Sequence, residues 1–474
     1  MKEILLGTLW FEPEFTKGSE QEGFRYLPAL SLFSEDEREA TYKVPHYAPA
    51  ASGRCFGPLA LDQVLQFCYG LNELLTDNGA KVVLYTGVAK EQDYNNALVL
   101  IGAFLLWTRN WTPKQLTDVL GAKAGLRGFV CSFASAARPE PPRVLRVKDC
   151  WEGLSLARDM GWFDTEVLYQ RHLVEAAVER HRRFADIYDA AWLIPGRLMV
   201  SGEPVTTAMD PNPATVKHVF PPEGVTRKGS HQSSSDARSV TNTTVSAPRS
   251  PSSRAGCGED SDGDGSQVSS WVDTTSNSDA AAVHEVFQPT SVSPRVKPVP
   301  SPWGGEMKDV LKKTSSTNFV DFLLDNGVGN ILRTNALQER GMITPSYDRM
   351  QFINDFGIQH FDIPFEDGAV PSKDDVREAL TSLQGVLDGK GNNTGLLVHC
   401  KGGFGRSVMM ACCLMIDQFD ISGLQLLAWV RIARPGAVNT PRQERFLQSL
   451  TGRADLHRYM KGAEAQCGLA CSVQ

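Results

Sequence analysis

Two stretches of the chain repeat the same order of apolar and polar segments. In the first, residues 81–86 form a short apolar run typical of a buried strand, and a loop separates them from an apolar helix predicted over 95–107. In the second, residues 396–400 have the strand pattern and the helix is predicted over 407–419. The order strand, loop, helix therefore occurs twice.

A further helix is predicted after each of these units. Residues 111–120 begin with Thr112 before Pro113, a helix-start signal, and Ser422 opens a helical stretch over 424–431. We interpret the two halves as copies of one α/β unit. Two unrelated strand–loop–helix units would give the same pattern, and this alternative stays open.

The composition changes sharply between residues 210 and 302, which are rich in Ser, Thr, Pro, Gly and Asp and show no sustained apolar period. Such a segment buries too little surface to offset its ordering entropy. We therefore predict a first domain over 1–203, a disordered linker with one short basic helix over 204–313, and a second domain over 314–455, followed by a tail. Residues 260–265 resemble a calcium loop, but no acidic residue closes it at the twelfth position.

Composition and charge narrow the functional classes. The 474 residues carry a net charge of −7, which argues against a nucleic-acid binder that works by bulk charge. The N-terminus lacks a signal-peptide pattern, and the longest apolar stretch, 97–107, is too short to span a bilayer. The ten cysteines lack metal-ligand spacing, so we expect reduced thiols in a cytoplasmic or nuclear protein, with no metal and no cofactor.

The loop of the second unit, residues 399–407, reads H-C-K-G-G-F-G-R-S. A glycine-rich turn between a buried strand and a helix presents backbone N–H groups and the positive helix end to an anion. The same field favours a thiolate at Cys400. Arg406 can bind two phosphate oxygens through its planar guanidinium, and Ser407 can donate a hydrogen bond to the sulfur when it leaves. The alternative, a chance glycine turn around a structural cysteine, is disfavoured because strand, loop, arginine and helix agree.

The first unit lacks these groups. Thr86 occupies the position that Cys400 has in the second unit, and the residue six places further on is Gln92 instead of arginine. The first unit therefore has the predicted shape of a phosphate site without nucleophile or cation.

Further segments carry a resemblance to a known family. In the first half they are 56–59 (FGPL), 71–72, 85–86, 96–97, 100–103 (LIGA), 161–164 (GWFD) and 192–196 (WLIPG). In the second half they are 365–368 (FEDG), 371–372, 398–406 (VHCKGGFGR), 428–431 (AWVR) and 434–436 (RPG). With these segments the chain resembles the dual-specificity protein phosphatases of the cell-division-cycle fourteen family. The loop is common to cysteine phosphatases, whereas the combination of an inactive first unit, the F-x-D-G segment and A-W-x-R-x-x-R-P-G is specific to this group.

The resemblance implies tandem cysteine-phosphatase-like α/β domains, each with a mixed central sheet flanked by helices. The first, lacking the catalytic cysteine, would help to recognise the substrate, and the second would perform the chemistry. The resemblance also implies phosphorylated proteins as partners, a preference for phosphoserine followed by proline, and a place in the cytoplasm, the nucleus or cytoskeletal structures. No obligate partner is evident.

The residues fit dephosphorylation through a covalent intermediate. Cys400 is the predicted nucleophile and would carry a phosphocysteine. Arg406 and the loop amides would stabilise the equatorial phosphate oxygens. The other residues of the predicted phosphate-binding loop are His399, Lys401, Gly402, Gly403, Phe404 and Gly405. We expect His399 to order the loop and to tune the thiol instead of transferring protons.

A general acid must protonate the leaving oxygen. Asp367 matches the acid of the family and precedes Gly368, a candidate hinge, but Asp362 and Glu366 lie close by and are the rivals. Gln443 matches a family glutamine that positions the hydrolytic water, although the family has one residue fewer between this glutamine and the Phe-Leu pair that follows.

Three features depart from the family. Val408 stands where glycine is usual, and Phe404 replaces a smaller residue at the loop rim, which would change the depth of the pocket. The acidic groove that accepts a basic residue of the substrate in the family corresponds to residues 163–190. These residues mix acidic with basic side chains, as a solvated helical face does.

The last four residues, Cys-Ser-Val-Gln, fit the C-a-a-X pattern for farnesylation at Cys471. Cys467 is a candidate palmitoylation site, because one lipid alone binds membranes weakly. The alternative is an unmodified tail. Membrane association would depend on these lipids.

The sequence thus predicts a protein phosphatase with a cysteinyl-phosphate intermediate. The alternatives are a phosphoinositide phosphatase, for which Lys401 in the loop would suit a polyanion, and a catalytically weak, membrane-tethered scaffold that binds phosphoproteins.

Overall fold

The structure is a computed structural model. It describes residues 1–15, 18, 20–31, 58–76, 80–86, 91–129, 145–204, 308, 310, 318–339, 345–387 and 394–462. These residues belong to one compact unit. Most of the predicted linker and the tail with Cys467 and Cys471 lie outside the described residues.

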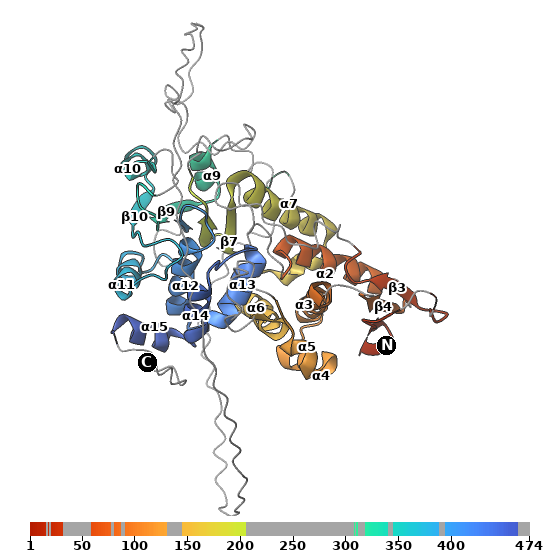
Figure 1. Ribbon diagram of the computed structural model, residues 1–474. Helices are drawn as coiled ribbons and strands as arrows, with labels where there is room; N and C mark the ends of the chain where they lie inside the picture. Colours follow the sequence, from red (N-terminus) through yellow and green to blue (C-terminus); the bar gives the residue numbers. More distant parts are fainter. Residues whose placement is uncertain are drawn as a thin grey trace, which may run out of the picture. The chain divides into compact units, whose positions relative to one another are not determined.

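The first sheet has four strands, β1 (Lys2–Leu5), β2 (Leu9–Phe11), β3 (Arg25–Pro28) and β4 (Val82–Tyr85), in the order β1-β2-β4-β3 (Figure 1). Strand β4 pairs in parallel with both neighbours, whereas β1 and β2 are antiparallel. The first three residues of β4 are buried, as expected for a central parallel strand. Its position confirms the strand predicted over 81–86.

Six helices of the first half are described: α2 (Leu61–Thr76), α3 (Glu91–Thr108), α4 (Pro113–Leu120), α5 (Ala122–Leu126), α6 (Val147–Asp159) and α7 (Arg171–Tyr188). A 3₁₀ turn, η1 (Thr165–Tyr169), precedes α7, and the short strands β5 (Gly128–Phe129) and β6 (Leu145–Arg146) pair with each other. Helix α4 starts as predicted: Thr112 caps it with a reciprocal capping box, and Pro113 follows in the first turn.

The second sheet carries the predicted phosphate loop. Its strands are β7 (Ala190–Ile194), β8 (Leu198–Ser201), β9 (Val328–Arg333), β10 (Gln359–Asp362) and β11 (Gly395–His399). The order is β10-β9-β11-β8-β7; the first four of these strands are parallel, and β7 runs antiparallel to β8. Strand β11 is the central strand and is buried along its whole length.

The second sheet contains strands from both sides of the expected domain boundary at residue 203. Strands β7 and β8 precede that boundary, yet β8 hydrogen-bonds in parallel to β11, which carries the loop. Strand β11 is buried on both faces, so its backbone needs a hydrogen-bonded strand along each edge. Strand β9 pairs with one edge of β11 and β8 pairs with the other. The sheet that holds the loop is therefore assembled from chain segments on both sides of residues 205–317 (Figure 1).

Seven helices of the second half are described: α9 (Phe319–Asp325), α10 (Arg349–Phe356), α11 (Lys373–Ser382), α12 (Arg406–Phe419), α13 (Gly423–Ala433), α14 (Pro441–Ser449) and α15 (Arg453–Met460). Helix α12 follows the loop and is buried along most of its length, and Ser422 caps α13 as predicted. In the described part of the chain, no helix is both long and apolar enough to cross a bilayer.

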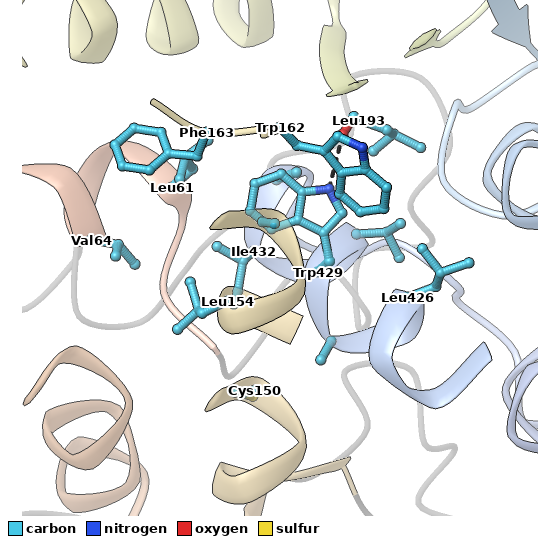
Figure 2. Packing of buried hydrophobic residues seen from close by; sticks show 14 of the residues in the cluster. Leu61, Val64, Cys150, Leu154, Trp162, Phe163, Leu193, Leu426, Trp429 and Ile432 are labelled. Carbon is cyan, nitrogen blue, oxygen red and sulfur yellow. Dashed lines mark hydrogen bonds between the residues drawn. The ribbon is translucent and has the colours of Figure 1, made fainter. Parts of the chain in front are cut away.

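The two halves share one hydrophobic core. Trp429 of α13 lies between helices of both halves, and its indole N–H donates to the Leu193 carbonyl of β7 at 2.9 Å (Figure 2). Its ring centroid is 6.1 Å from that of Trp162, which follows α6. Leu154 of α6 belongs to the same cluster (Figure 2). Burial of such large side chains, worth about 1.5–3 kcal/mol each, ties the first half to the loop-bearing half.

Candidate active site

The predicted phosphate loop connects the carboxyl end of β11 to the first turn of α12. Gly405 occupies the N-cap position of α12, and no side chain caps this helix. The first N–H groups of a helix have no intrahelical partner, and the helix dipole adds positive potential there. The loop therefore ends at a helix terminus suited to an anion.

The sulfur of Cys400 is buried and lies among hydrogen-bond donors. The Gly403 N–H donates to Sγ at 3.1 Å, and the Ser407 hydroxyl oxygen lies 3.5 Å from Sγ. The cysteine is 3% exposed. An amide and a hydroxyl at this position stabilise the negative charge that a nucleophilic sulfur carries. The structure thus brings Ser407 to the sulfur, as the sequence predicted.

Arg406 lies across the loop with its guanidinium held on one edge. Both terminal nitrogens bind the carboxylate of Glu339, one of them with an N–O distance of 2.9 Å, and Nη1 also donates to the Phe365 carbonyl at 3.1 Å. The Nε atom is buried and has no hydrogen-bond partner among the described residues. Its nearest acidic atom is Asp367 Oδ1, at 3.5 Å. The Nε edge is therefore the one that remains for a phosphate oxygen.

Glu339 was not predicted from the sequence. It lies 67 residues before Arg406, outside any motif, so no local pattern indicates it. Burial raises the pKa of its carboxyl, but hydrogen bonds from Arg406 and the Ala336 N–H lower the pKa by more, so it lies below its ordinary value. Glu339 is therefore a carboxylate at neutral pH, and its bidentate contact orients Arg406.

We expect Glu339→Gln to reduce kcat/KM for an aryl phosphate by about 10- to 100-fold, because hydrogen bonds to a charged group contribute about 1.5–3 kcal/mol. Steady-state kinetics and the inhibition constant of inorganic phosphate measure this effect. The matched control is Glu366→Gln, which removes an exposed carboxylate on the nearby loop. Tighter phosphate binding in Glu339→Gln would show that the carboxylate competes with phosphate instead of orienting Arg406.

The three candidate acids have different surroundings. Asp362 is held by ion pairs with Arg333 at 2.7 Å and with Arg349 at 3.2 Å. Glu366 is exposed. Asp367 is half-exposed and is the candidate that approaches Arg406. The geometry therefore favours Asp367, while its role as general acid stays a prediction.

The segment with Asp367 is attached to the start of α14. The Thr440 hydroxyl donates to the Gly368 carbonyl at 3.0 Å, and Gln443 Nε2 donates to the Ala369 carbonyl at 2.9 Å. Gly368 has a φ of +74°, a conformation that glycine adopts without strain. The segment that carries the predicted acid is therefore hydrogen-bonded to the predicted water-positioning glutamine.

Gln443 also packs on the phosphate loop. A Cβ atom on Gly405 would lie 3.3 Å from Gln443 Oε1 and 2.9 Å from Asn439 Oδ1. Both oxygens are buried and lack a hydrogen-bond partner among the described residues. Gln443 thus lies beside the loop, with an acceptor that a water could use.

His399 is buried behind the loop. Its Nε2 contacts the Tyr347 hydroxyl at 2.5 Å, and the same hydroxyl contacts His360 Nε2 at 2.8 Å. The Thr334 hydroxyl and N–H both donate to the His399 carbonyl at 2.9 Å. Burial, followed by the neighbouring His360 and Arg333, holds the pKa of His399 well below its ordinary value. A neutral, hydrogen-bonded ring suits the predicted ordering role.

The structure corrects the expected position of Phe404. Its side chain is buried instead of lining the rim, and the Arg434 guanidinium lies 4.2 Å from the ring centroid. Arg434 also donates to the Gly403 carbonyl at 2.6 Å and to Asp189 at 2.8 Å. The large ring therefore supports the loop from the interior. Val408 is likewise fully buried, in the first turns of α12.

The Thr86 hydroxyl of the first unit donates to the Pro13 carbonyl at 3.0 Å, and the loop that follows, residues 87–90, lies outside the described residues. On α7 and α2, arginines neutralise acidic side chains in three pairs, Arg171 with Glu175, Arg183 with Glu179 and Arg182 with Asp62. Helix α7 thus has the mixed, paired charges expected of a solvated face.

Parts of the chain are similar to known proteins. A family model described as the N-terminal half of dual specificity protein phosphatases matches residues 33–157. A second model, described as a DSP-PTPase phosphatase of polymorphic toxin systems, matches residues 305–418. The solved structure of Tk-PTP in its active form is similar over 26% of this chain and 79% of that chain, with 23% identity and a TM-score of 0.23.

Two curated relatives cover different shares of the chain. Mouse CDC14A, a dual specificity protein phosphatase, is 22% identical over 85% of this chain and 48% of its own length. The tyrosine-protein phosphatase cdc-14 of Caenorhabditis elegans is 31% identical over 29% of this chain and 18% of its own length. The chain spans less than half the length of these relatives. Together with the match to the dual specificity model, these similarities relate the chain to the CDC14 phosphatases.

Proposed function

We propose that this chain is a dual-specificity protein phosphatase that hydrolyses phosphate monoesters through a cysteinyl-phosphate intermediate. The observation that carries the proposal is the arrangement of the loop. The sulfur of Cys400 lies among donors, and the Nε edge of Arg406 has no hydrogen-bond partner among the described residues. Asp367 is the acidic group that faces that edge.

In the first step, the sulfur of Cys400 attacks phosphorus and the bond from phosphorus to the ester oxygen breaks. Asp367 donates its proton to the leaving oxygen, so that a neutral alcohol departs. Arg406 and the loop N–H groups stabilise the equatorial oxygens in the transition state.

In the second step, a water molecule attacks the phosphocysteine. The Asp367 carboxylate accepts a proton from this water, and the sulfur leaves with a hydrogen bond from Ser407. Gln443 supplies the acceptor that orients the water. The residues named here complete the cycle with inorganic phosphate as product, so the scheme requires no cofactor.

The proposed substrate class rests on the similarity to the CDC14 phosphatases. Proteins phosphorylated on serine or threonine before proline are the proposed substrates, and the first half is the proposed recognition unit, with Thr86 in place of a nucleophile. The acidic groups Glu175 and Glu179 each pair with an arginine of the same helix. A basic residue after the proline would therefore meet acidic side chains that are already paired. The proposed location is the cytoplasm, the nucleus or cytoskeletal structures.

A substrate panel tests the proposal. It contains an aryl phosphate, phosphopeptides with serine before proline and before alanine, a phosphotyrosine peptide and inositol phosphates, and Cys400→Ser is the blank. Turnover of the peptides above that of the inositol phosphates supports the proposal. Preference for inositol phosphates would favour a phosphoinositide phosphatase, and no turnover of any substrate would leave a phosphoprotein-binding scaffold.

A further inference from the structure

Glu203 lies where three segments meet behind the phosphate loop. It follows β8, the strand that pairs with β11, and its N–H donates to the Lys401 carbonyl inside the loop at 3.0 Å. Its side chain points to a different segment: one carboxyl oxygen accepts from Asn335 Nδ2 at 2.6 Å and the other from the Ser346 hydroxyl at 2.8 Å. One residue thus joins the loop to the chain that follows β9.

The contacts continue to the groups that support the catalytic cysteine. Ser346 accepts a hydrogen bond from Arg333 Nη1 at 2.9 Å, and Arg333 binds Asp362. Arg333 also donates to the carbonyl of Tyr347, whose hydroxyl contacts His399, the residue before Cys400. A displacement of the Glu203 carboxylate would therefore reach the loop by two routes, through Lys401 and through His399.

The glycines around Glu203 show how closely the loop packs against this strand end. Gly403 has a φ of +72°, and a Cβ on it would lie 2.4 Å from the Gly202 nitrogen. A Cβ on Gly202 would lie 2.3 Å from Asp189 Oδ2. The loop cannot shift against residues 201–203 without steric cost, so the position of Glu203 is transmitted to the loop.

We propose that Glu203 is a positioning residue that fixes the phosphate loop for catalysis by binding Asn335 and Ser346 as a carboxylate. This inference rests on the proposed phosphatase activity. Glu203 touches none of the reacting atoms and acts through the loop. Charge-assisted hydrogen bonds are shorter and stronger than neutral ones, so the ionised form holds these segments most firmly.

The ionisation of Glu203 supplies a specific readout. Burial raises its pKa to about 7, while hydrogen bonds from Ser346 and Asn335 and the charge of Arg333 lower it. Among the described residues, the charged and titratable groups that face it are Arg333 of β9, Glu339 after β9 and Tyr347. Glu203 is therefore mainly protonated at about pH 6 and mainly ionised at about pH 8.

The test compares kcat/KM for an aryl phosphate in wild type and Glu203→Gln from about pH 6 to about pH 8. We expect the ratio of wild type to variant to rise about tenfold across this range, since only the wild type gains the charge-assisted bonds. Ionisations common to both proteins cancel in the ratio. Asp149→Asn, which removes a buried carboxylate that accepts from the Arg146 N–H at the start of α6, is the matched control and should give a flat ratio.

A flat ratio for Glu203→Gln as well would overturn the proposal and leave Glu203 a structural residue. Ser346→Ala is the second variant, for use if Glu203→Gln does not fold. It removes a hydrogen bond that lowers the pKa of Glu203. The rise of kcat/KM with pH should therefore occur at higher pH in Ser346→Ala than in wild type. An unmoved rise would also contradict the proposal.

Failure of the proposed function is distinguishable from failure of this inference. If the wild type does not turn over any phosphate ester, the proposed function fails. The affinity of the Cys400→Ser protein for inorganic phosphate, measured by calorimetry with and without Glu203→Gln, then tests the loop alone. We expect about tenfold weaker binding with Glu203→Gln at about pH 8, and equal affinities would reject the positioning role.

Discussion

Cys400→Ser is expected to lower turnover of an aryl phosphate by about 10⁴-fold or more, while inorganic phosphate and phosphopeptides still bind. A hydroxyl is a weak nucleophile unless a base removes its proton. Among the described residues, the Gly403 N–H and the Ser407 hydroxyl contact the sulfur at this position, and the nearby His399 ring contacts Tyr347. The structure therefore supplies hydrogen-bond donors here in place of a base.

Binding should survive because the groups that hold phosphate are untouched. Arg406 stays attached to Glu339, and the loop N–H groups keep their positions. Kinetics of aryl phosphate hydrolysis and calorimetry with inorganic phosphate measure the two properties. Cys413→Ser makes the same chemical change inside α12, away from the loop, and serves as the control. Turnover within about tenfold of wild type in Cys400→Ser would eliminate Cys400 as the nucleophile.

Local sequence patterns predicted the parts of the site that are close in the chain. The strand, glycine loop and helix around Cys400 follow from apolar periodicity and from spacing, and β11 and α12 occur where they were predicted. The capped helices α4 and α13 were predicted from Thr112 and Ser422 for the same reason. Short-range hydrogen bonding decides such elements, so a single sequence contains the signal.

Contacts between distant segments were not predicted. The carboxylate of Glu339 binds Arg406, which lies 67 residues later in the chain, and that of Glu203 binds Ser346, which lies 143 residues later. Strand β8 was assigned to the first domain because it precedes the change in composition, but strand order depends on which edges remain unpaired in three dimensions. Periodicity identifies a buried strand and does not identify its neighbour.

The misplacement of Phe404 has a related cause. A side chain within a loop motif was assumed to line the rim, whereas Arg434, 30 residues further on, provides a cation against its ring and draws it to the interior. For the general acid, by contrast, the structure reduced the number of candidates, because Asp362 forms ion pairs with Arg333 and Arg349.

Asp367→Asn is expected to slow a phosphoserine peptide by about 10²- to 10⁴-fold and an activated aryl phosphate far less. Serine leaves as a basic alkoxide that needs a proton in the transition state, whereas an activated phenolate leaves without one. The amide of asparagine has no proton to give but preserves the size of the side chain beside Arg406. The measurement is kcat/KM for both substrates, in wild type and variant, under the same conditions.

Two neighbouring variants make the assignment specific. Glu366→Gln changes an exposed side chain and should leave both substrates unaffected. Asp362→Asn removes the ion partner of Arg333, so it should lower thermal stability while slowing both substrates to a similar extent. If Asp362→Asn instead slows the phosphoserine peptide selectively, the proton comes from Asp362. If Asp367→Asn slows both substrates equally, Asp367 binds the phosphate group through Arg406 and does not protonate the leaving oxygen.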